Sequence, residues 1–461
     1  MSIERRKQIA HETVMLVIPF LLLISPPTYG QTLSGQHHDY LLQAECEIGF
    51  SGSVLVMKDD SILLAEGYGL ANREQSIPNT ANTKFLLCSV TKQFTATAIM
   101  QLAERGLLAL NDPITKYIPA DAGSSADKIT IYNLLTQTSG MADYLSLVDS
   151  KETFNRPVPT AEVTSKFLNT PLEFEPGSQW QYSNSNYYLL GKIIETVSGM
   201  TYGEFLEMNI FEPLEMRNSG FPDRYLNDLP MAAVGYKAND AGELVAASAV
   251  HGNWPFAAGG LYSTANDMAK WERSLRTETV LTNESIAKMY IPYKWRYGCG
   301  WEIDTLYGHP TVSHGGMGGG YCSIIIRFVD DPFCVVVLSN SGDAFKQVSK
   351  IAYDLVAITF GAPLAKDTSN ELVTVSTRLL EEYAGDYEVA PGITLSFRCR
   401  DGRMFTQGPG QPEIEIYPRS ETDFFLKVTD GSVQFVRDSA GTVNGIIIRQ
   451  GGRDMSAKKI R

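Results

Sequence analysis

The sequence predicts an α+β fold, in which helices and a helical half flank a mainly antiparallel sheet, followed by a small β-barrel-like domain. Three observations support this prediction. Strand-like hairpins stand near both ends of the first part of the chain, helical patterns and turn residues fill residues 111–275, and short strand-like segments dominate after about Asp367. Strands at both ends with helices between them favour an α+β or α/β sandwich whose sheet is mainly antiparallel.

Two hairpins are expected to supply the sheet. Residues 52–57 (GSVLVM) and 61–65 (SILLA) are apolar segments joined by a short polar turn. Residues 323–329 and 334–340 form a second apolar pair, and residues 344–359 are typical of a closing helix.

A helix is expected between the hairpins, directly after Ser89. Phe94, Ala98 and Leu102 recur at helical spacing, and Gly106 marks the end of the pattern. Ser89 is therefore expected where an apolar segment turns into an amphipathic helix.

The end of the chain has a different character. Strand-like segments of five to seven residues alternate with glycine turns, at residues 394–398, 424–428, 433–437 and 443–449. We expect a first domain over residues 31–365 and a small β-domain over residues 366–461.

The N-terminus resembles an export signal. A positive start at residues 5–7, an apolar run at 15–24 and small residues at 28 and 30 predict a signal peptide over residues 1–30. We expect a periplasmic or secreted protein with no stable membrane insertion after cleavage. The alternative is a membrane anchor formed by an uncleaved signal, although the run is about half of the ~20 residues that a spanning helix needs.

Charge and composition exclude some partners and cofactors. The net charge is −13 and no basic block occurs, so nucleic-acid binding is not expected. His37, His38 and Asp39 are adjacent but lack a matching cluster of ligands, and no H-E-x-x-H motif is present, so neither a metal nor another cofactor is predicted. The six cysteines form no C-x-x-C pair; most are expected to be buried thiols, with Cys322 and Cys334 not facing each other.

The first candidate motif is S-x-x-K, which begins at Ser89, Ser125, Ser285 and Ser456. A lysine three residues along a helix can reach the serine hydroxyl, as acyl transfer through serine requires. Only Ser89 lies at the head of a predicted helix, whose N-terminus favours developing negative charge. We predict Ser89 as nucleophile and Lys92 as its partner. The alternative is a helix-capping serine beside a solvated lysine.

The second motif is Tyr182-Ser183-Asn184, which follows a turn and precedes a helical pattern. A tyrosine beside a lysine ammonium can transfer protons, and the asparagine can bind a substrate carbonyl or bridge to the lysine. Alternatively, Tyr182 is a buried structural residue.

The third motif is His314-Gly315-Gly316, before the strand at residue 323. A donor at position 314 can orient a carboxylate or transfer protons, and Gly316 lets a substrate backbone lie close. The alternative is a mobile glycine loop.

In this order, the three motifs resemble those of the serine β-lactamase and penicillin-binding protein family. The similarity is greatest to its class C β-lactamase and D-alanyl-D-alanine carboxypeptidase branch, and it extends over about residues 41–361. Neighbouring segments are similar too, at residues 134–140 (LLTQTSG), 176–177 (PG), 259–264 (GGLYST) and 337–340 (VLSN).

The resemblance implies an antiparallel sheet with a helical half and an active site at their junction. It implies a serine hydrolase in which Ser89 is acylated, Lys92 is its partner and Tyr182 is the general base and acid. The implied substrates are small peptides, esters or β-lactams. The positions implied to contact substrate are Asn184, His314, Gly316 and Met317, with the oxyanion hole formed by the N–H groups of Ser89 and Met317.

Two departures qualify the resemblance. Gln137 stands where relatives usually have histidine, and His314 stands where most β-lactamases have lysine. The second change favours a peptidase or esterase over efficient β-lactam hydrolysis. A non-catalytic receptor or scaffold is the competing hypothesis. The tail from about Glu381 resembles a small β-barrel domain and is expected to shape or cap substrate access.

Overall fold

The computed structural model describes residues 32–119, 125–148, 156–364, 373–426, 431–438, 440–450 and 453–460. The predicted signal peptide and the predicted domain boundary lie outside these residues. Within these ranges, no helix has both the length and the apolar character needed to cross a lipid bilayer.

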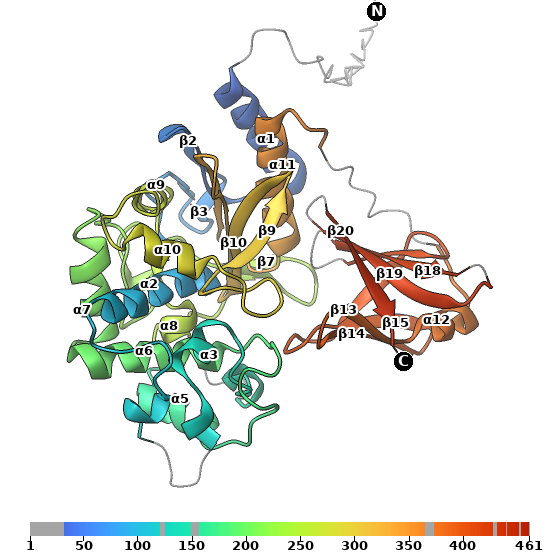
Figure 1. Ribbon diagram of the computed structural model, residues 1–461. Coiled ribbons are helices and arrows are strands. Elements are labelled where there is room, and N and C mark those ends of the chain that lie inside the picture. The colour runs from blue at the N-terminus through green and yellow to red at the C-terminus, as the bar shows by residue number, and fades with distance from the viewer. Residues whose placement is uncertain are drawn as a thin grey trace, which may run out of the picture.

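A six-stranded antiparallel sheet forms the centre of the first domain (Figure 1), with strand order β2-β1-β12-β11-β10-β9. The strands are β1 (Gly52–Lys58), β2 (Ser61–Tyr68), β9 (Glu302–Leu306), β10 (His309–Gly318), β11 (Tyr321–Phe328) and β12 (Phe333–Ser339). Gly52 lies opposite Ser339 and Lys58 opposite Phe333, so β1 and β12, from the two ends of the domain, pair along their whole length. β1 also pairs with β2, and β11 with β12, so both predicted hairpins are confirmed.

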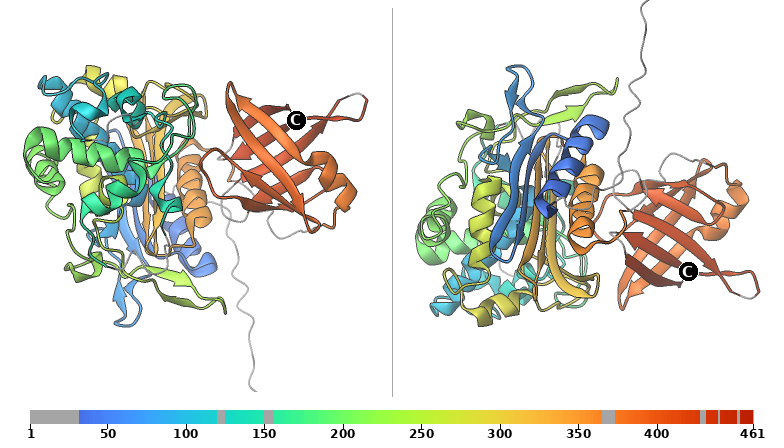
Figure 2. Two further views of the ribbon diagram at one scale, coloured as in Figure 1. Left: turned by 90° about the horizontal axis from the view of Figure 1, so that it is seen from below. Right: turned by 90° about the horizontal axis from the view of Figure 1, so that it is seen from above.

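Successive residues of the central strands enter two different cores. Val54 and Val56 pack on one face of the sheet with α1 (Leu33–Ile48) and α11 (Phe345–Phe360), whereas Leu55 joins the larger core on the other face. This alternation follows from the two-residue period of a strand. Figure 2 shows α1 and α11 together on one side of the sheet and the remaining helices of the domain on the other.

The helical half covers the second face. Its helices are α2 (Thr91–Glu104), α3 (Ile131–Leu135), α5 (Thr160–Phe167), α6 (Asn184–Ser198), α7 (Tyr202–Leu206), α8 (Phe256–Gly259), α9 (Ala265–Ser274) and α10 (Asn283–Met289). Short strand pairs tie the connecting segments together: β3 (Leu70–Asn72) with β4 (Ile77–Pro78), β5 (Phe85–Leu86) with β8 (Tyr262–Ser263), and β6 (Tyr236–Ala238) with β7 (Leu244–Ala246).

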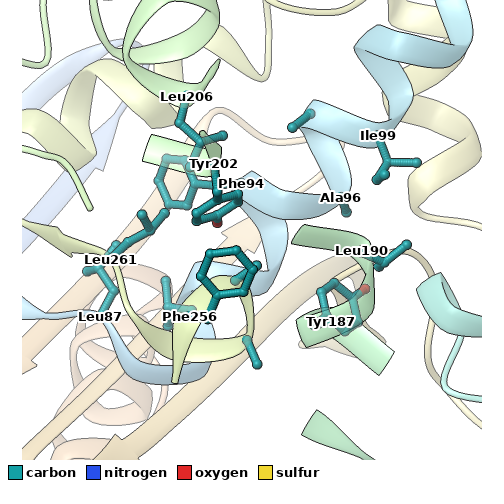
Figure 3. Packing of buried hydrophobic residues seen from close by; sticks show 14 of the residues in the cluster. Leu87, Phe94, Ala96, Ile99, Tyr187, Leu190, Tyr202, Leu206, Phe256 and Leu261 are labelled. Carbon is teal, nitrogen blue, oxygen red and sulfur yellow. The ribbon is translucent and has the colours of Figure 1, made fainter. Parts of the chain in front are cut away.

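Helix α2 differs from the expected amphipathic helix. Every residue from Thr91 to Leu102 is buried, because α6, α8 and α10 pack around it. Figure 3 shows Phe94, Tyr202 and Phe256 packed in this core. Some polar side chains on α2 have buried partners; Thr95, for example, donates to the carbonyl oxygen of Ala257 at 2.7 Å. The helix pattern was predicted correctly, but its polar face is not exposed to solvent.

The last part of the chain is a closed barrel of eight antiparallel strands, preceded by α12 (Thr377–Tyr383). The strands are β13 (Gly385–Ala390), β14 (Ile393–Arg400), β15 (Arg403–Gln407), β16 (Ile414–Pro418), β17 (Asp423–Leu426), β18 (Gly431–Arg437), β19 (Val443–Gln450) and β20 (Arg453–Lys459). Buried aromatic rings pack against one another there, as Tyr383 does on Phe435 at 4.1 Å between ring centroids. The predicted fold class is confirmed, although four of the eight strands were not predicted.

The six cysteines all lie in the described part of the chain and are all free. Four of them are buried, as expected for small apolar thiols. Cys322 pairs in register with Ser339 and Cys334 with Arg327, at opposite ends of the β11–β12 ladder. The prediction that these two cysteines do not face each other is confirmed.

Candidate active site

Ser89 lies in a tight turn that leads into α2. The turn is a 3-10 helix (Cys88–Val90), and Cys88 takes a left-handed conformation with φ of 48°. The segment before it is held in place because the Leu87 N–H donates to the Leu261 carbonyl oxygen at 2.7 Å. Ser89 itself is half-buried, so its hydroxyl is accessible at the junction between the sheet and the helical half.

Lys92 is fully buried one helical turn after Ser89. Its Nζ lies 3.1 Å from Ser89 Oγ, 2.8 Å from Asn184 Oδ1 and 2.7 Å from the carbonyl oxygen of Ala258. Loss of hydration lowers the pKa of Lys92 to about 7, against smaller opposing effects of Asp143 and Cys88. A large fraction of this lysine is therefore neutral near pH 7.

The neighbours of Lys92 suit the neutral amine. A neutral amine has two N–H donors and one lone pair, whereas carbonyl oxygens can only accept. The oxygens of Asn184 and Ala258 therefore take the two N–H groups. The lone pair can then accept the proton of the Ser89 hydroxyl, which a nucleophilic serine must lose.

Tyr182 joins the same group from the loop before α6. The Lys92 Nζ lies 4.8 Å from the centroid of its ring. Burial raises the pKa of Tyr182 well above its ordinary value, although a hydrogen bond with Ser89 opposes this effect. Tyr182 is thus a neutral phenol beside the Lys92 amine, so it is suited to donate or relay a proton and is not a resting phenolate.

Asn184 bridges Lys92 to a carboxylate that sequence reasoning did not single out. Its Oδ1 accepts from Lys92, and its Nδ2 donates to Asp143 Oδ2 at 2.8 Å. Because a carboxylate only accepts, Asp143 fixes which end of the amide faces the lysine. Asp143 lies just after the LLTQTSG segment; the sequence offered no signal that it would meet residue 184, because the two are 41 residues apart.

Strand β10 passes directly beside the nucleophile. A Cβ atom on Gly316 would lie 2.7 Å from the Ser89 amide nitrogen and 2.8 Å from Cys88 Cβ, so only glycine fits there. Met317 follows and lines the adjacent cavity. The segments that carry the two predicted oxyanion N–H groups, at Ser89 and Met317, are therefore brought together; that assignment stays a prediction.

His314 occupies an unexpected environment. Its Nδ1 lies 2.7 Å from the Gly315 carbonyl oxygen and its Nε2 lies 3.1 Å from the Tyr297 hydroxyl. Since a carbonyl only accepts, we assign the proton to Nδ1, and Nε2 then accepts from Tyr297. Burial and the nearby Lys92 lower the pKa of His314 to about 3. Both ring nitrogens thus have protein partners and the ring is neutral, so neither nitrogen is left to orient a substrate carboxylate as expected.

Gln137 accepts hydrogen bonds from the loop that carries Tyr182. Its backbone oxygen accepts from the Gln181 N–H and its Oε1 from the Ser183 N–H, both at 3.0 Å. Gln137 itself adopts φ of 59° and is fully buried. The departure from the usual histidine therefore lies at a position that holds both neighbours of Tyr182.

A cavity of about 190 Å³ opens beside Ser89. Its wall is mostly apolar, with side chains of Leu86, Tyr144, Leu145, Val250, Trp254 and Met317. Ser89 and Asn184 supply polar groups, and no charged residue is among the described residues that line it. The cavity therefore suits a neutral, apolar group next to the reacting carbonyl.

The other three S-x-x-K sequences have no comparable surroundings. Lys128 pairs with Glu175 at 3.1 Å and Lys288 with Glu284 at 2.8 Å, both as exposed ion pairs. Ser456 lies on strand β20, where positions i and i+3 point to opposite faces. Across the described residues, no group of three or more His, Cys, Asp or Glu side chains is placed to hold a metal ion.

Comparisons with known proteins agree with this geometry. Residues 48–358 match the beta-lactamase family, and residues 369–459 match a domain of unknown function, DUF3471. The chain is 26% identical over 436 residues to a penicillin-binding protein of Bacillus subtilis (strain 168), covering 89% of this chain and 95% of that protein.

Solved structures share the architecture. The octameric penicillin-binding protein homologue from Pyrococcus abyssi is 27% identical with a TM-score of 0.65, covering 92% of this chain and 99% of that one. The penicillin-binding protein from Bacillus halodurans is 29% identical with a TM-score of 0.62, covering 70% of this chain and 98% of that one. The family match spans most of the chain and confirms the resemblance inferred from the three motifs, so this protein belongs to the serine beta-lactamase and penicillin-binding protein family.

Proposed function

We propose that this protein is a serine hydrolase that works through an acyl-enzyme on Ser89. One observation carries the proposal: the Nζ of a buried lysine lies 3.1 Å from Ser89 Oγ, and its two other polar neighbours are carbonyl oxygens. This arrangement favours removal of a proton from the serine. A buried lysine retained only for stability would be expected beside a carboxylate.

The proposed reaction has two halves. The Lys92 amine takes the hydroxyl proton as Ser89 Oγ attacks the substrate carbonyl, and the N–H groups of Ser89 and Met317 bind the resulting oxyanion. The tetrahedral intermediate collapses as the leaving group receives a proton from Tyr182, which regains one from Lys92. Water then attacks the acyl-enzyme, the same groups take its proton, and Ser89 is released with the carboxylic acid product.

We further propose that the substrates are neutral esters or amides with an apolar acyl group. Two features support this choice. The cavity beside Ser89 is apolar and has no charged residue among its described lining residues. His314, which stands where a lysine would attract a substrate carboxylate, is neutral with both nitrogens engaged. β-Lactams and D-alanyl-D-alanine peptides, which carry a free carboxylate, are therefore expected to be poorer substrates.

A labelling experiment tests the nucleophile. Treatment with a fluorophosphonate should add one adduct mass, mapped to Ser89, and abolish turnover of a p-nitrophenyl ester. Ser89→Ala should take up no label and lose turnover, whereas Ser285→Ala, in another S-x-x-K sequence, should keep both. An unlabelled, inactive but folded wild-type protein would contradict the proposal and favour the non-catalytic receptor or scaffold.

A substrate panel tests the chemical class. kcat/KM should be highest for p-nitrophenyl esters of medium-length acyl chains and lower for nitrocefin and D-alanyl-D-alanine peptides. Leu145→Asp, which places a charge on the wall of the cavity, should reduce the preference for longer acyl chains. Equal or higher kcat/KM for the carboxylate substrates would overturn the assignment of class while leaving the nucleophile in place.

A further inference from the structure

The barrel contacts the loop that carries Tyr182. Trp180, Tyr297 and Ile393 form a buried cluster in which Ile393, from the start of β14, is 2% exposed. The cluster also includes the less buried residues Tyr182, Trp295, Val389 and Ala390. Trp180 lies 5.9 Å from Trp295 and 6.1 Å from Tyr297 between ring centroids. The β13–β14 hairpin of the barrel is therefore packed into an aromatic group of the first domain.

A second barrel segment approaches the same loop. Gly410, between β15 and β16, has φ of 68°. A Cβ atom at this position would lie 2.6 Å from the Tyr182 carbonyl oxygen and 2.6 Å from Gln181 Cγ. Real Cβ atoms do not approach backbone so closely, so the barrel backbone is in direct contact with the backbone of the proposed proton donor.

The Tyr182 loop is thus held on two sides. Gln137 binds the N–H groups of Gln181 and Ser183 from within the first domain. The barrel covers Trp180 and the Tyr182 carbonyl from the other side. In contrast, the described residues that line the cavity beside Ser89 all come from the first domain. The contact of the barrel is therefore with the loop and not with the cavity wall.

We propose that the barrel is a positioning element for Tyr182, acting through Ile393 and Gly410. The proposal rests on the proposed hydrolase function. Proton transfer requires the phenol to stay within hydrogen-bond reach of Ser89 and the leaving group, and a shift of about 1 Å can reduce a rate by ~10²-fold. Loosening the barrel contact should therefore lower kcat more than it raises KM. This differs from the expectation that the tail caps substrate access, which would act mainly on KM.

A pair of glycine variants tests the contact. Gly410→Ala should lower kcat for p-nitrophenyl acetate by about 10- to 100-fold, with KM within about twofold of wild type. Gly441→Ala is the matched control, because Gly441 is also a left-handed barrel glycine, with φ of 82°, but has no atom within 4 Å of its would-be Cβ. Both variants place an alanine in a left-handed conformation, and only Gly410→Ala adds a clash with the Tyr182 loop, so the difference between them reports on the contact. Equal kcat in the two variants would overturn the proposal.

A second pair tests the apolar half of the contact. Ile393→Ser should lower kcat, whereas Ile393→Val, which keeps an apolar side chain there, should have a kcat close to that of wild type. Val443→Ser, at a buried site of 7% exposure within the barrel's own core, should reduce stability but not kcat. The pH dependence of kcat should also change in Ile393→Ser and not in Val443→Ser, since only the former moves a proton-transfer group. Loss of kcat in both serine variants alike would show a purely structural role for the barrel.

The two proposals fail in different ways. If the wild-type protein neither turns over esters nor takes up a fluorophosphonate on Ser89, the hydrolase function is wrong. If wild type is active and Gly410→Ala matches Gly441→Ala, the hydrolase function stands and the positioning role of the barrel is wrong.

Discussion

Two buried bases in the same site, Lys92 and His314, titrate in different pH ranges. Lys92 and His314 are both lowered in pKa by burial, but Lys92 reaches about 7 and His314 about 3. The carboxylate of Asp143 partly offsets burial for Lys92, whereas the charge of Lys92 adds to burial for His314. Burial alone therefore does not choose the base. Because the two pKa values fall by similar amounts, from 10.5 to about 7 and from 6.5 to about 3, the ordinary pKa of each group decides which one titrates in the neutral range.

Their hydrogen bonds differ in the same sense. His314 has fixed protein partners for both ring nitrogens, Tyr297 and the Gly315 carbonyl. Lys92 has two fixed acceptors and, as its third neighbour, the hydroxyl of Ser89. We infer that Lys92 takes part in the reaction and that His314 supports the wall of the site. The following experiments test this distinction.

The largest effect is expected from removal of the lysine. Lys92→Met keeps the length of the side chain but removes the amine, so kcat for a p-nitrophenyl ester should fall by ~10³-fold or more. His314→Gln, which can keep hydrogen bonds to Tyr297 and Gly315, should lower kcat by less than about 10-fold. Steady-state kinetics on both variants checks this order, and a reversed order would exchange the roles of the two bases.

A smaller effect is expected in the pH dependence. kcat/KM should rise as the pH rises through about 7, because only the neutral Lys92 amine accepts the serine proton. Asp143→Asn keeps an acceptor for Asn184 but removes a charge that raises the pKa of Lys92, so this limb should move to lower pH. Asp228→Asn, at an exposed aspartate, is the control and should not shift this limb of the pH profile. A limb that does not respond to Asp143→Asn would mean that another group titrates there.

The smallest effect concerns acid stability. The folded-state pKa of His314, about 3, lies below its ordinary value of 6.5, so between these values the unfolded chain binds a proton that the folded protein does not. Stability should therefore fall as the pH falls from 6.5 toward 3, by up to about 1.4 kcal/mol per pH unit from this group. Between about pH 7 and pH 4, the melting temperature of His314→Gln should fall by less than that of wild type. Equal losses would show that His314 is protonated in the folded protein.

The predictability of the fold differed between its two parts. The hairpins β1–β2 and β11–β12 are long, apolar and bounded by turn residues, so sequence pattern located them within a few residues. In the barrel, β15 (Arg403–Gln407) and β20 (Arg453–Lys459) carry arginine or lysine among few apolar residues, and were not predicted. A strand whose outer side chains face solvent gives a weak signal, and only closure of the barrel shows where it lies.

The site shows the same division. The three motifs located Ser89, Lys92, Tyr182, Asn184, His314 and Gly316, and the structure brings their segments together. Asp143, Tyr297 and the barrel residues Ile393 and Gly410 were missed. Each of them reaches the site through a contact between distant parts of the chain, and none lies in a recognisable motif.

The sequence by itself determined which residue types are available, where the regular elements form and in what order the motifs occur. These depend on local propensity, side-chain periodicity and spacing, which are properties of the chain alone. Only the tertiary structure decided the chemical state of the groups. Burial and neighbouring charge set the pKa values of Lys92 and His314, and contact with the barrel fixes the loop of Tyr182. Loss of hydration and contacts between residues far apart in the sequence arise only when the chain folds.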